Sequence, residues 1–457
     1  MNKTDKIAVL GLGREGLDLL RFLHKMKIKP VGLNADEILA TDPRYRDVHK
    51  MTSRIYWGKD YLDHLGEFDL VFRSPGVPLD LPAIKSAKKR GVQFSSLTQL
   101  FFDVCPAKII GVTGTKGKST TTSLIYHLLK GDYKNKVYFG GNIGYPPLML
   151  LNKLTKRDIV VFELSSFQLE DLAKSPHVAV MLMVAPEHLD RHKTYRKYLK
   201  AKLNLVKYQT KHDFAVVNID DKLAGSVAKA TPAKLIKHSL RKILPRGVYV
   251  AGQDIVFRDF QTGRRQVIMP TNEITLSGEH NLVNALAAIT AVLIMGIAPT
   301  KIRQRLKSFV ALEHRLELVG HLGQVNFIND SMATTPVATM AALQAVTGNV
   351  SVILGGVSKK EDFRGLIKYL VERSLAGAVL IGQTGPQLKI MFKSTKVTFP
   401  VTLAKDFPSA VKMAYDLVKP EGTVILSPAC ASFGWFKDAY DRGDQFKLLV
   451  KELIGGK

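Results

Sequence analysis

The sequence predicts an α/β protein made of three domains. Short apolar strands alternate with helical patterns along most of the chain, which is the pattern of βαβ units on a parallel sheet. A length of 457 residues suits about three domains of about 150 residues each. Changes of motif divide the chain into three blocks, and we expect domains at residues 1–105, 106–311 and 312–457.

The composition limits the class of protein. Hydrophobic residues make up 46% of the chain, which is enough for ordinary globular cores. Only two cysteines occur, Cys105 and Cys430, so we expect no disulfide framework and a cytoplasmic location. The N-terminus does not resemble a signal peptide, and no uninterrupted apolar run reaches about 18 residues. We therefore expect no membrane span.

The formal net charge of +26 favours anionic partners. The basic residues are spread along the chain with only short clusters, such as residues 85–90, and no zinc finger or aromatic-basic RNA motif occurs. A generally basic proteome or a bound polyphosphate explains the charge more simply than a nucleic acid. We therefore expect no nucleic-acid partner.

The first block begins as a Rossmann-like βαβ unit. The turn from Gly11 to Gly16 has the G-x-G-x-x-G spacing of dinucleotide-binding turns. Asn34 stands where such turns carry an acidic residue for the ribose, so the pattern does not favour NAD. The expected elements are strands at 7–10, 30–33 and 69–73, a helix through Leu23 and a rigid turn at 74–78.

The second block opens with a phosphate-binding loop between an apolar strand and a helical pattern at 122–129. Glycines let the backbone approach phosphates, and a helix N-terminus faces the anion. Lys118 can reach the outer phosphates, and Ser119 can bind Mg²⁺. Val112 stands where the usual G-x-x-x-x-G-K-S spacing has its first glycine. The loop comprises Gly114, Thr115, Lys116, Gly117, Lys118, Ser119 and Thr120.

The rest of the second block also alternates strands and helices. A strand at 158–163 places Glu163 at its C-terminal end, where ligands of open parallel sheets gather. A strand at 178–184 leads to a segment rich in acidic residues and histidines at 187–192. The further elements are a helix at 195–208, a strand at 214–218, a β-rich region at 236–276 and an apolar helix from Ser277 to Gly296.

The third block predicts a second Rossmann-like domain. Four apolar strands alternate with helical segments after Ala311, and crossover helices between such strands make the sheet parallel. The strands are expected at 325–330, 350–354, 377–381 and 423–426.

Several motifs follow one another in a fixed order over about residues 106–445. They are Gly114 to Thr120, Gly140 to Gly144, Phe162 to Glu170, Glu187 to His192, Ala201 to Leu203, Gly278 to Asn281 with Asn284, His314 to Glu317, Asn329 to Ser331, Gly355 with Gly356, and Ser427 to Ser432. Together they resemble the Mur ligases, most closely the MurD type, and the first block is similar through its glycine turn and Ser-Pro-Gly. The runs Glu-Leu-Ser-Ser-Phe-Gln-Leu and Ser-Pro-Ala-Cys-Ala-Ser are the most specific.

The resemblance implies ATP-dependent amide formation in peptidoglycan precursor synthesis. The carboxylate of UDP-N-acetylmuramoyl-L-alanine would be phosphorylated, and the amine of glutamate would then attack the acyl phosphate. Because both the carboxylate and the triphosphate are anionic, Mg²⁺ and cationic side chains must neutralise them. It also implies a Rossmann-like UDP-substrate domain, a P-loop ATPase domain, and a Rossmann-like domain that brings in the amino acid.

The resemblance assigns roles to single residues. The catalytic set would be Lys118, Glu163, His188 and Lys202. The metal ligands would be Ser119, Glu163, His188 and Lys202, with Lys202 carbamylated by CO₂ and its neighbour Lys200 left in solvent. ATP would further contact Asn281, Asn284, Arg315 and Asp330. The substrates would contact Gly13, Arg14, Asn34, Ser74, Gly76, Asn142, Ser165, Lys359 and Ser432.

The sequence departs from the MurD pattern at four positions. Met332 stands where that type usually has a lysine, and Val357 replaces an acidic residue after two glycines. Ala439 replaces an aromatic residue near the amino-acid pocket, and Asn34 replaces an aspartate near the uridine. All four bear on substrate recognition, so D-glutamate, L-glutamate and another amino acid stay open as substrates.

Other functions stay open from the sequence alone. A related ligase for a different amino acid is the nearest alternative, whereas the run Phe162 to Phe167 disfavours a folylpolyglutamate synthase. The charge of +26 leaves a nucleic-acid-stimulated P-loop ATPase open, and Met332 leaves a non-catalytic scaffold open. We expect a monomer that binds small-molecule substrates.

Overall fold

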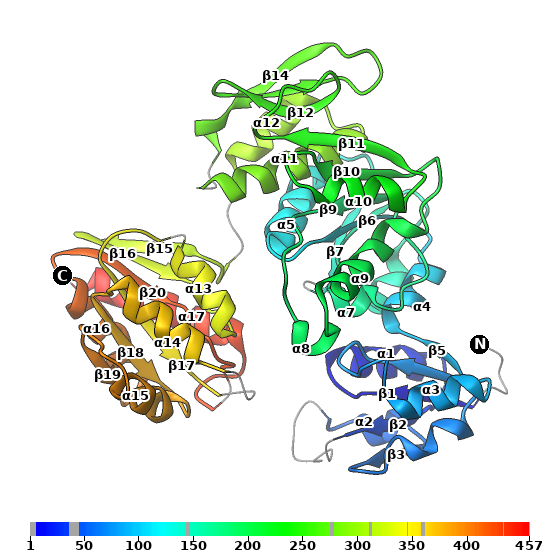
Figure 1. The fold of residues 1–457 in the computed structure, drawn as a ribbon, viewed down its shortest axis with the longest axis horizontal. Helices are drawn as coiled ribbons and strands as arrows, with labels where there is room; N and C mark the ends of the chain where they lie inside the picture. The colour runs from blue at the N-terminus through cyan, green and yellow to red at the C-terminus, as the bar shows by residue number, and fades with distance from the viewer. Residues whose placement is uncertain are drawn as a thin grey trace. The chain divides into compact units, whose positions relative to one another are not determined.

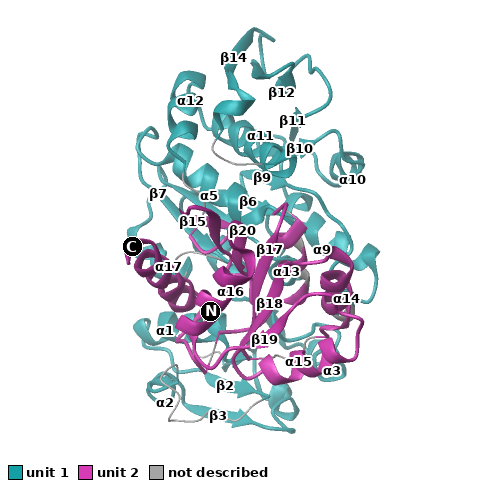
Figure 2. Ribbon diagram, turned by 90° about the vertical axis from the view of Figure 1, so that its left-hand side faces the viewer, with its two compact units in different colours: residues 1–309 teal, residues 310–457 magenta. Residues whose placement is uncertain are grey.

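The computed structural model describes residues 6–35, 45–142, 147–274, 278–309, 313–344, 346–357, 362–432 and 434–456. The chain forms two compact units, residues 1–309 and 310–457 (Figure 2). Two β-sheets belong to the first unit and one belongs to the second (Figure 1). The predicted α/β class with three sheets is confirmed, while the domain boundaries at 105/106 and 311/312 stay predictions.

The first sheet is entirely parallel and has the order β3-β2-β1-β4-β5. This is the Rossmann-like arrangement that the glycine turn predicts. Its strands are β1 (Ile7–Leu10), β2 (Val31–Asn34), β3 (Arg54–Trp57), β4 (Leu70–Arg73) and β5 (Gln93–Ser95). Its helices are α1 (Arg14–Lys25), α2 (Val48–Met51), η1 (Asp63–Glu67), α3 (Pro82–Lys89) and α4 (Leu97–Val104).

The turn between β1 and α1 needs two of its glycines. Gly11 has a φ of +87°, in the left-handed region that favours glycine. A Cβ atom on Gly16 would lie 2.1 Å from the carbonyl oxygen of Gly11. The helix can therefore start directly beneath the turn only because both positions lack a side chain.

The second sheet has the order β14-β13-β12-β11-β10-β9-β6-β8-β7. Its strands from β7 to β12 are parallel, and β12 to β14 form an antiparallel extension. The β-rich region expected at 236–276 contains most of β11 and this extension. The strands are β6 (Lys108–Thr113), β7 (Val137–Gly141), β8 (Ile159–Glu163), β9 (Val178–Met181), β10 (Phe214–Asn218), β11 (Lys234–Ser239), β12 (Gly247–Ala251), β13 (Asp254–Arg258) and β14 (Arg265–Pro270).

Helices cover this second sheet, and two of them form the core beside the phosphate loop. Leu124 and Ile125 of α5 pack in one buried cluster with Leu286 and Ile289 of α11, and this burial fixes where α5 begins. The helices are α5 (Lys118–Leu129), α6 (Pro147–Leu150), η2 (Leu151–Lys153), α7 (Ser166–Leu169), α8 (Leu189–His192), α9 (Tyr195–Lys207), α10 (Leu223–Ala230), η3 (Thr271–Glu273), α11 (Glu279–Ile294) and α12 (Pro299–Lys307).

The second unit holds a sheet of the order β15-β16-β20-β17-β18-β19. The four predicted strands correspond to β16, β20, β17 and β18 and are parallel, as expected. The sheet has two further strands: β19 pairs parallel with β18, and β15 pairs antiparallel with β16. The strand β15 was not predicted, and it pairs antiparallel because Gly323 alone, at φ +61°, joins the two strands, which is too short for a crossover. The strands are β15 (Glu317–Leu322), β16 (Gln324–Asn329), β17 (Val350–Gly355), β18 (Gly377–Ile381), β19 (Val401–Leu403) and β20 (Glu421–Leu426).

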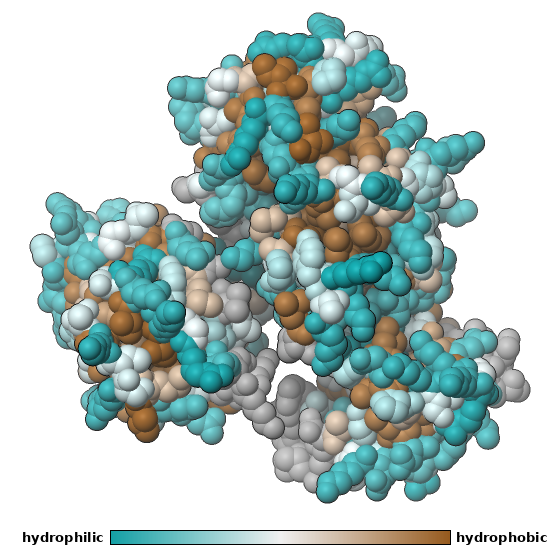
Figure 3. Space-filling model, viewed as in Figure 1, coloured by the Kyte–Doolittle hydropathy of each residue, from teal (hydrophilic) through white to brown (hydrophobic). Residues whose placement is uncertain are grey.

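In the described part of the second unit, the helices are α13 (Pro336–Gln344), α14 (Arg364–Arg373), α15 (Gly385–Lys393), α16 (Phe407–Val418) and α17 (Ala439–Gly455). Across the described residues, no helix is both long and apolar enough to cross a membrane. The face seen in Figure 3 is largely hydrophilic, with smaller hydrophobic areas between the polar side chains.

The glycine turn gives a stability prediction. Gly16→Ala should destabilise the first unit by about 1–3 kcal/mol, because the added Cβ forces the turn and the helix apart. Thermal unfolding measures the change. Gly13→Ala is the matched control, since nothing lies within 4 Å of a Cβ at that position. Equal melting temperatures for the two variants would contradict the packing argument.

Candidate active site

The phosphate loop joins β6 to α5 in the strand–turn–helix context that the sequence predicts. Gly117 caps the N-terminus of α5 with a φ of +82°, and a Cβ there would lie 2.2 Å from the side-chain oxygen of Asn284. The Lys118 amine donates to the carbonyl oxygens of Gly114 at 3.1 Å and Thr115 at 2.9 Å. The backbone of the loop therefore surrounds the Lys118 amine. The loop lies next to the first turn of α5, whose amide groups have no partner within the helix.

The structure brings Lys202 of α9 to the same loop. Its side chain is 1% exposed, and its amine donates to the Gly114 carbonyl oxygen at 2.8 Å and the Thr113 hydroxyl at 3.4 Å. Burial, with a smaller contribution from the charge of Lys118, lowers the pKa of Lys202 to about 7. Lys200 is exposed, so the two lysines differ as expected.

Glu163 ends β8 beside the loop, and its side chain is buried. Its Oε1 accepts a hydrogen bond from the Asn142 amide at 2.8 Å. Its Oε2 is buried without a hydrogen-bond partner among the described residues. A buried carboxylate oxygen without a donor is costly, so this atom is suited to a bound cation. The predicted neighbours Asn142 and Glu163 are thus in contact.

A buried tyrosine links the loop to the segment before α8. The Tyr198 hydroxyl lies 2.9 Å from the Thr115 hydroxyl and donates to Glu187 at 3.4 Å. His188 has a φ of +54°, and its Nε2 lies 3.6 Å from Glu187 Oε2. The imidazole of His188 also packs against the Phe167 ring, with 4.9 Å between the ring centres.

The predicted ATP contacts on α11 also lie at the loop. Asn284 is buried, and its amide donates to Asn281 at 3.3 Å, which places both on one face of the helix. Ser119 is likewise buried in the first turn of α5. No three His, Cys, Asp or Glu side chains gather into a metal-binding group within the described ranges. The predicted metal ligands instead include the hydroxyl of Ser119 and the carbamylated side chain of Lys202.

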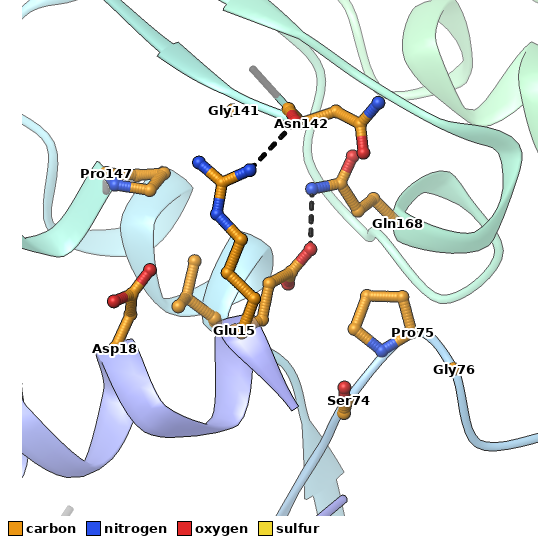
Figure 4. A pocket seen from close by; sticks show the side chains of 11 residues that line it. Glu15, Asp18, Ser74, Pro75, Gly76, Gly141, Asn142, Pro147 and Gln168 are labelled. Carbon is orange, nitrogen blue, oxygen red and sulfur yellow. Dashed lines mark hydrogen bonds between the residues drawn. The ribbon is translucent and has the colours of Figure 1, made fainter. Parts of the chain in front are cut away.

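A cavity of about 210 Å³ lies where the first two sheets meet (Figure 4). The residues predicted to bind substrate that line it are Arg14, Ser74, Gly76 and Asn142. Glu15, Asp18 and Gln168 also line it, although no sequence signal pointed to them. Two other predicted contacts have local partners. The Asn34 side chain accepts from the backbone amide of Leu12 at 2.9 Å, and the Ser165 hydroxyl caps α7 by accepting from the backbone amide of Gln168 at 3.2 Å.

Two arginines hold the turn that carries Ser74 and Gly76. Arg73 is buried, pairs with Asp171 at 2.8 Å and donates to the Val77 carbonyl oxygen at 2.6 Å. Arg191, in α8, donates to the carbonyl oxygens of Gly76 and Val77, both at 2.8 Å. Elements of the second sheet thus fix the backbone of a turn in the first.

In the second unit, the predicted ATP contact Asp330 is buried after β16. Burial raises the pKa of its carboxyl to about 7, against the hydrogen bond that Ser427 donates at 2.8 Å. The positive charge of Arg315 also acts on this carboxyl. Asn329 donates to Glu317 at 3.2 Å. The two predicted residues Arg315 and Asp330 are therefore close enough to interact.

The loops after β16, β17 and β20 are also joined in this unit. Arg442 is fully buried and donates to the carbonyl oxygens of Ser331 at 2.8 Å and Cys430 at 3.2 Å. Ser432 is buried at the end of the same loop, and Val357 pairs with Ala431. Lys359 lies outside the described residues.

Two departures from the MurD pattern also lie in these loops. Met332 is half-buried, and its amide donates to the His314 carbonyl oxygen at 3.1 Å. Ala439 begins α17, and its carbonyl oxygen accepts from the Ser331 hydroxyl at 2.7 Å. Met332 therefore belongs to the segment 329–332, and Ala439 contacts that segment through Ser331.

Family models match each part of the chain. The Mur ligase MurD-like N-terminal domain covers residues 5–96, the Mur ligase middle domain covers 112–292, and the Mur ligase glutamate ligase domain covers 314–430. A phosphate loop with a buried strand-end carboxylate and a buried lysine, set in this fold, defines a class of ATP-dependent ligases. The chain belongs to the Mur ligase family, and the resemblance inferred from the motifs is confirmed.

Two relatives with similar sequences carry the same name. A UDP-N-acetylmuramoylalanine–D-glutamate ligase of Acetivibrio thermocellus is 36% identical over 99% of this chain and 97% of its own length. The enzyme of that name from Clostridium tetani is 34% identical over 98% of this chain and 97% of its own length.

Solved structures with low identity share the fold. UDP-N-acetylmuramate–alanine ligase MurC of Thermotoga maritima has a TM-score of 0.56 at 19% identity, over 99% of this chain and all of its own. MurF of Acinetobacter baumannii has a TM-score of 0.56 at 16% identity, over all of this chain and 95% of its own.

The loop geometry predicts that Lys118→Ala is folded but nearly inactive. Removing the amine takes away charge that must be in place for phosphoryl transfer, so we expect turnover to fall about 10³-fold or more. Phosphate release and melting temperature measure the two parts of this prediction. Lys130→Ala, at the exposed end of α5, should behave as wild type. Near-normal turnover of Lys118→Ala would remove the phosphate-loop assignment.

Proposed function

We propose that this protein is the ATP-dependent ligase that joins glutamate to UDP-N-acetylmuramoyl-L-alanine in peptidoglycan precursor synthesis. One observation carries the proposal: the amines of Lys118 and Lys202 meet at the Gly114 carbonyl oxygen of a phosphate loop. The names of the relatives support glutamate, and its D form, as the amino acid. The other sequence-level alternatives, a DNA-stimulated ATPase and a scaffold, have no comparable observation in their favour.

The reaction needs charge neutralisation before bonds change. The substrate carboxylate attacks the γ-phosphorus of ATP, the bond to ADP breaks, and an acyl phosphate forms. The amine of glutamate then attacks the acyl carbon, and inorganic phosphate leaves as the amide forms. Lys118 lies in the loop that would hold the outer phosphates, so its charge opposes the repulsion between the two anions. Gly114, Thr115, Lys116, Gly117 and Thr120 would supply backbone contacts.

Mg²⁺ fits the residues around the loop. The unpartnered Oε2 of Glu163 is a hard oxygen ligand of the kind that Mg²⁺ takes, and we propose that Ser119 and His188 serve with it. When bound, Mg²⁺ would reduce the negative charge of the triphosphate. In the second unit, Arg315 and Asp330 are our proposed ATP contacts, and Ser432 is the proposed amino-acid contact.

Lys202 is suited to carbamylation. Because its pKa is about 7, much of the amine is neutral at physiological pH and can attack CO₂. The nitrogen bonds to the carbon of CO₂, and a proton leaves to solvent. The product carries a negative carbamate in place of a cation, so it can serve as a metal ligand.

The remaining assignments are proposals of the same kind. Gly13, Arg14, Ser74, Gly76 and Asn142 would bind the nucleotide-sugar, and the cavity in the first unit supports all but the first. Asn34 and Ser165 are also proposed for this substrate. A cytoplasmic location and a monomeric state stay predictions, the former supported by two cysteines that form no disulfide.

Phosphate release from ATP tests the function directly. Release should require both UDP-N-acetylmuramoyl-L-alanine and glutamate, and a panel of D-glutamate, L-glutamate and related amino acids should favour the D form. Release stimulated by DNA, or no release with any amino acid, would contradict the proposal.

Lys202→Ala should be nearly inactive and partly rescued by short carboxylates such as acetate, which can replace the carbamate as a ligand. Mass spectrometry under CO₂ should detect the adduct on wild type, increasing as the pH rises through about 7, where the amine loses its proton. Lys200→Ala is the control and should retain full activity. An unmodified Lys202 together with an active alanine variant would rule out this role.

Met332→Lys should be tolerated and should improve the use of D-glutamate. The thioether and the lysine stem have similar lengths, and one regained charge-assisted contact is worth about 1.5–3 kcal/mol, or about 10- to 150-fold in affinity. The KM for D-glutamate measures the change, and Met391→Lys on α15 is a matched half-buried control. A low KM in wild type with no gain in the variant would show that Met332 is a neutral packing change.

A further inference from the structure

Glu15 is a carboxyl group that the proposed chemistry does not use. It lies in the first turn of α1 and lines the cavity in the first unit (Figure 4). Its Oε1 accepts a hydrogen bond from the side-chain amide nitrogen of Gln168 at 2.8 Å. Its Oε2 is buried, and none of the described residues gives it a hydrogen-bond partner.

The orientation of Gln168 decides which oxygen of Glu15 can carry a proton. The Gln168 Oε1 accepts from the Ser165 amide at 2.9 Å, so its nitrogen must face Glu15. The Oε1 of Glu15 is therefore an acceptor, and a proton on the carboxyl group belongs on Oε2. Without that proton, Oε2 would be a buried anionic oxygen with no donor, which is costly.

The surrounding charges do not overcome this burial. Among the described residues, Arg14 on α1 and Arg73 at the end of β4 favour the ionised carboxyl group, and Asp18 opposes it. Asp18 is itself paired with Arg21 at 2.9 Å, and Gln168 on α7 is neutral. Burial is the largest effect and raises the pKa of Glu15 to about 7.

We propose that Glu15 binds the nucleotide-sugar in its protonated form, its side chain turning so that the buried Oε2 reaches the cavity and donates a hydrogen bond to an oxygen of the diphosphate. The inference rests on the proposed function for the identity of this substrate. A glycine turn at the N-terminus of a helix binds phosphate groups, and Glu15 lies within such a turn. An ionised carboxylate would repel a diphosphate, whereas a protonated one supplies a donor.

The KM for UDP-N-acetylmuramoyl-L-alanine, measured against pH, tests the proposal. Because only the protonated form would bind, KM in wild type should rise about 10- to 30-fold between about pH 6.5 and about pH 8.5. The kcat should change much less, since Glu15 contacts no reacting atom. Glu67→Gln, which removes an exposed carboxylate paired with His64, should retain this profile.

Glu15→Gln is the sharpest variant because glutamine imitates the protonated carboxyl group. Its oxygen can accept from Gln168, and its amide can donate where Oε2 would. We expect its KM to stay within about threefold of the wild-type value at about pH 6.5 and to be flat with pH. Glu15→Ala should raise KM at every pH, with an unchanged melting temperature showing that the fold is kept.

A Glu15→Gln profile that still rises with pH would overturn the proposal, as would a KM as high as that of Glu15→Ala at low pH. Binding of UDP alone, measured by calorimetry, tests whether the acceptor oxygen belongs to the diphosphate. The same pH dependence with UDP supports the diphosphate, and its absence overturns that assignment. Because UDP binding needs no turnover, this measurement also separates failure of the Glu15 proposal from failure of the proposed ligase activity.

Discussion

The site is built around one atom, the carbonyl oxygen of Gly114, which accepts hydrogen bonds from two lysine amines. Lys118 lies 3.1 Å from it and Lys202 lies 2.8 Å from it. Two ammonium groups this close repel each other in a poorly solvated place. Burial of Lys202 removes much of this repulsion because it favours the neutral amine. The negative charges of Glu187 and Glu163 act in the opposite direction and stabilise the protonated amine. The charged Lys118 amine is a donor that a triphosphate needs, and the neutral Lys202 amine is the form that can react with CO₂ in the proposed carbamylation.

Central strands of the three sheets were predictable because burial on both faces leaves a continuous apolar run. The strand expected at 214–218 coincides with β10, whose middle residues are all buried. Among the strands that were not predicted, β3 and β7 lie at sheet edges, and their side chains are mostly exposed or half-buried, so no apolar run marks them. The antiparallel edge formed by β15 depends on a single residue, Gly323, which carries no periodic signal.

The site residues divide in a similar way. Lys118 and Glu163 were predictable from local sequence, since a glycine turn and a strand end have fixed positions in a parallel sheet. Lys202 was not, because its helix spacing alone suggests an exposed lysine, and only the family resemblance pointed to it. The contact between Glu15 and Gln168 joins positions 153 residues apart, so it depends on how two sheets meet. No pattern within either segment encodes such a contact.

The arginines around the turn at 74–77 couple the proposed nucleotide-sugar site to the proposed metal site. Arg191 lies three residues after His188 and holds the backbone of the turn that carries Ser74 and Gly76. A shift of this segment therefore moves both the proposed metal side and the proposed nucleotide-sugar side of the first unit. A substitution that displaces the backbone of the turn would therefore also displace Arg191 and the segment that carries His188. Recognition of the nucleotide-sugar and placement of the proposed metal ligand are thus mechanically coupled in this fold.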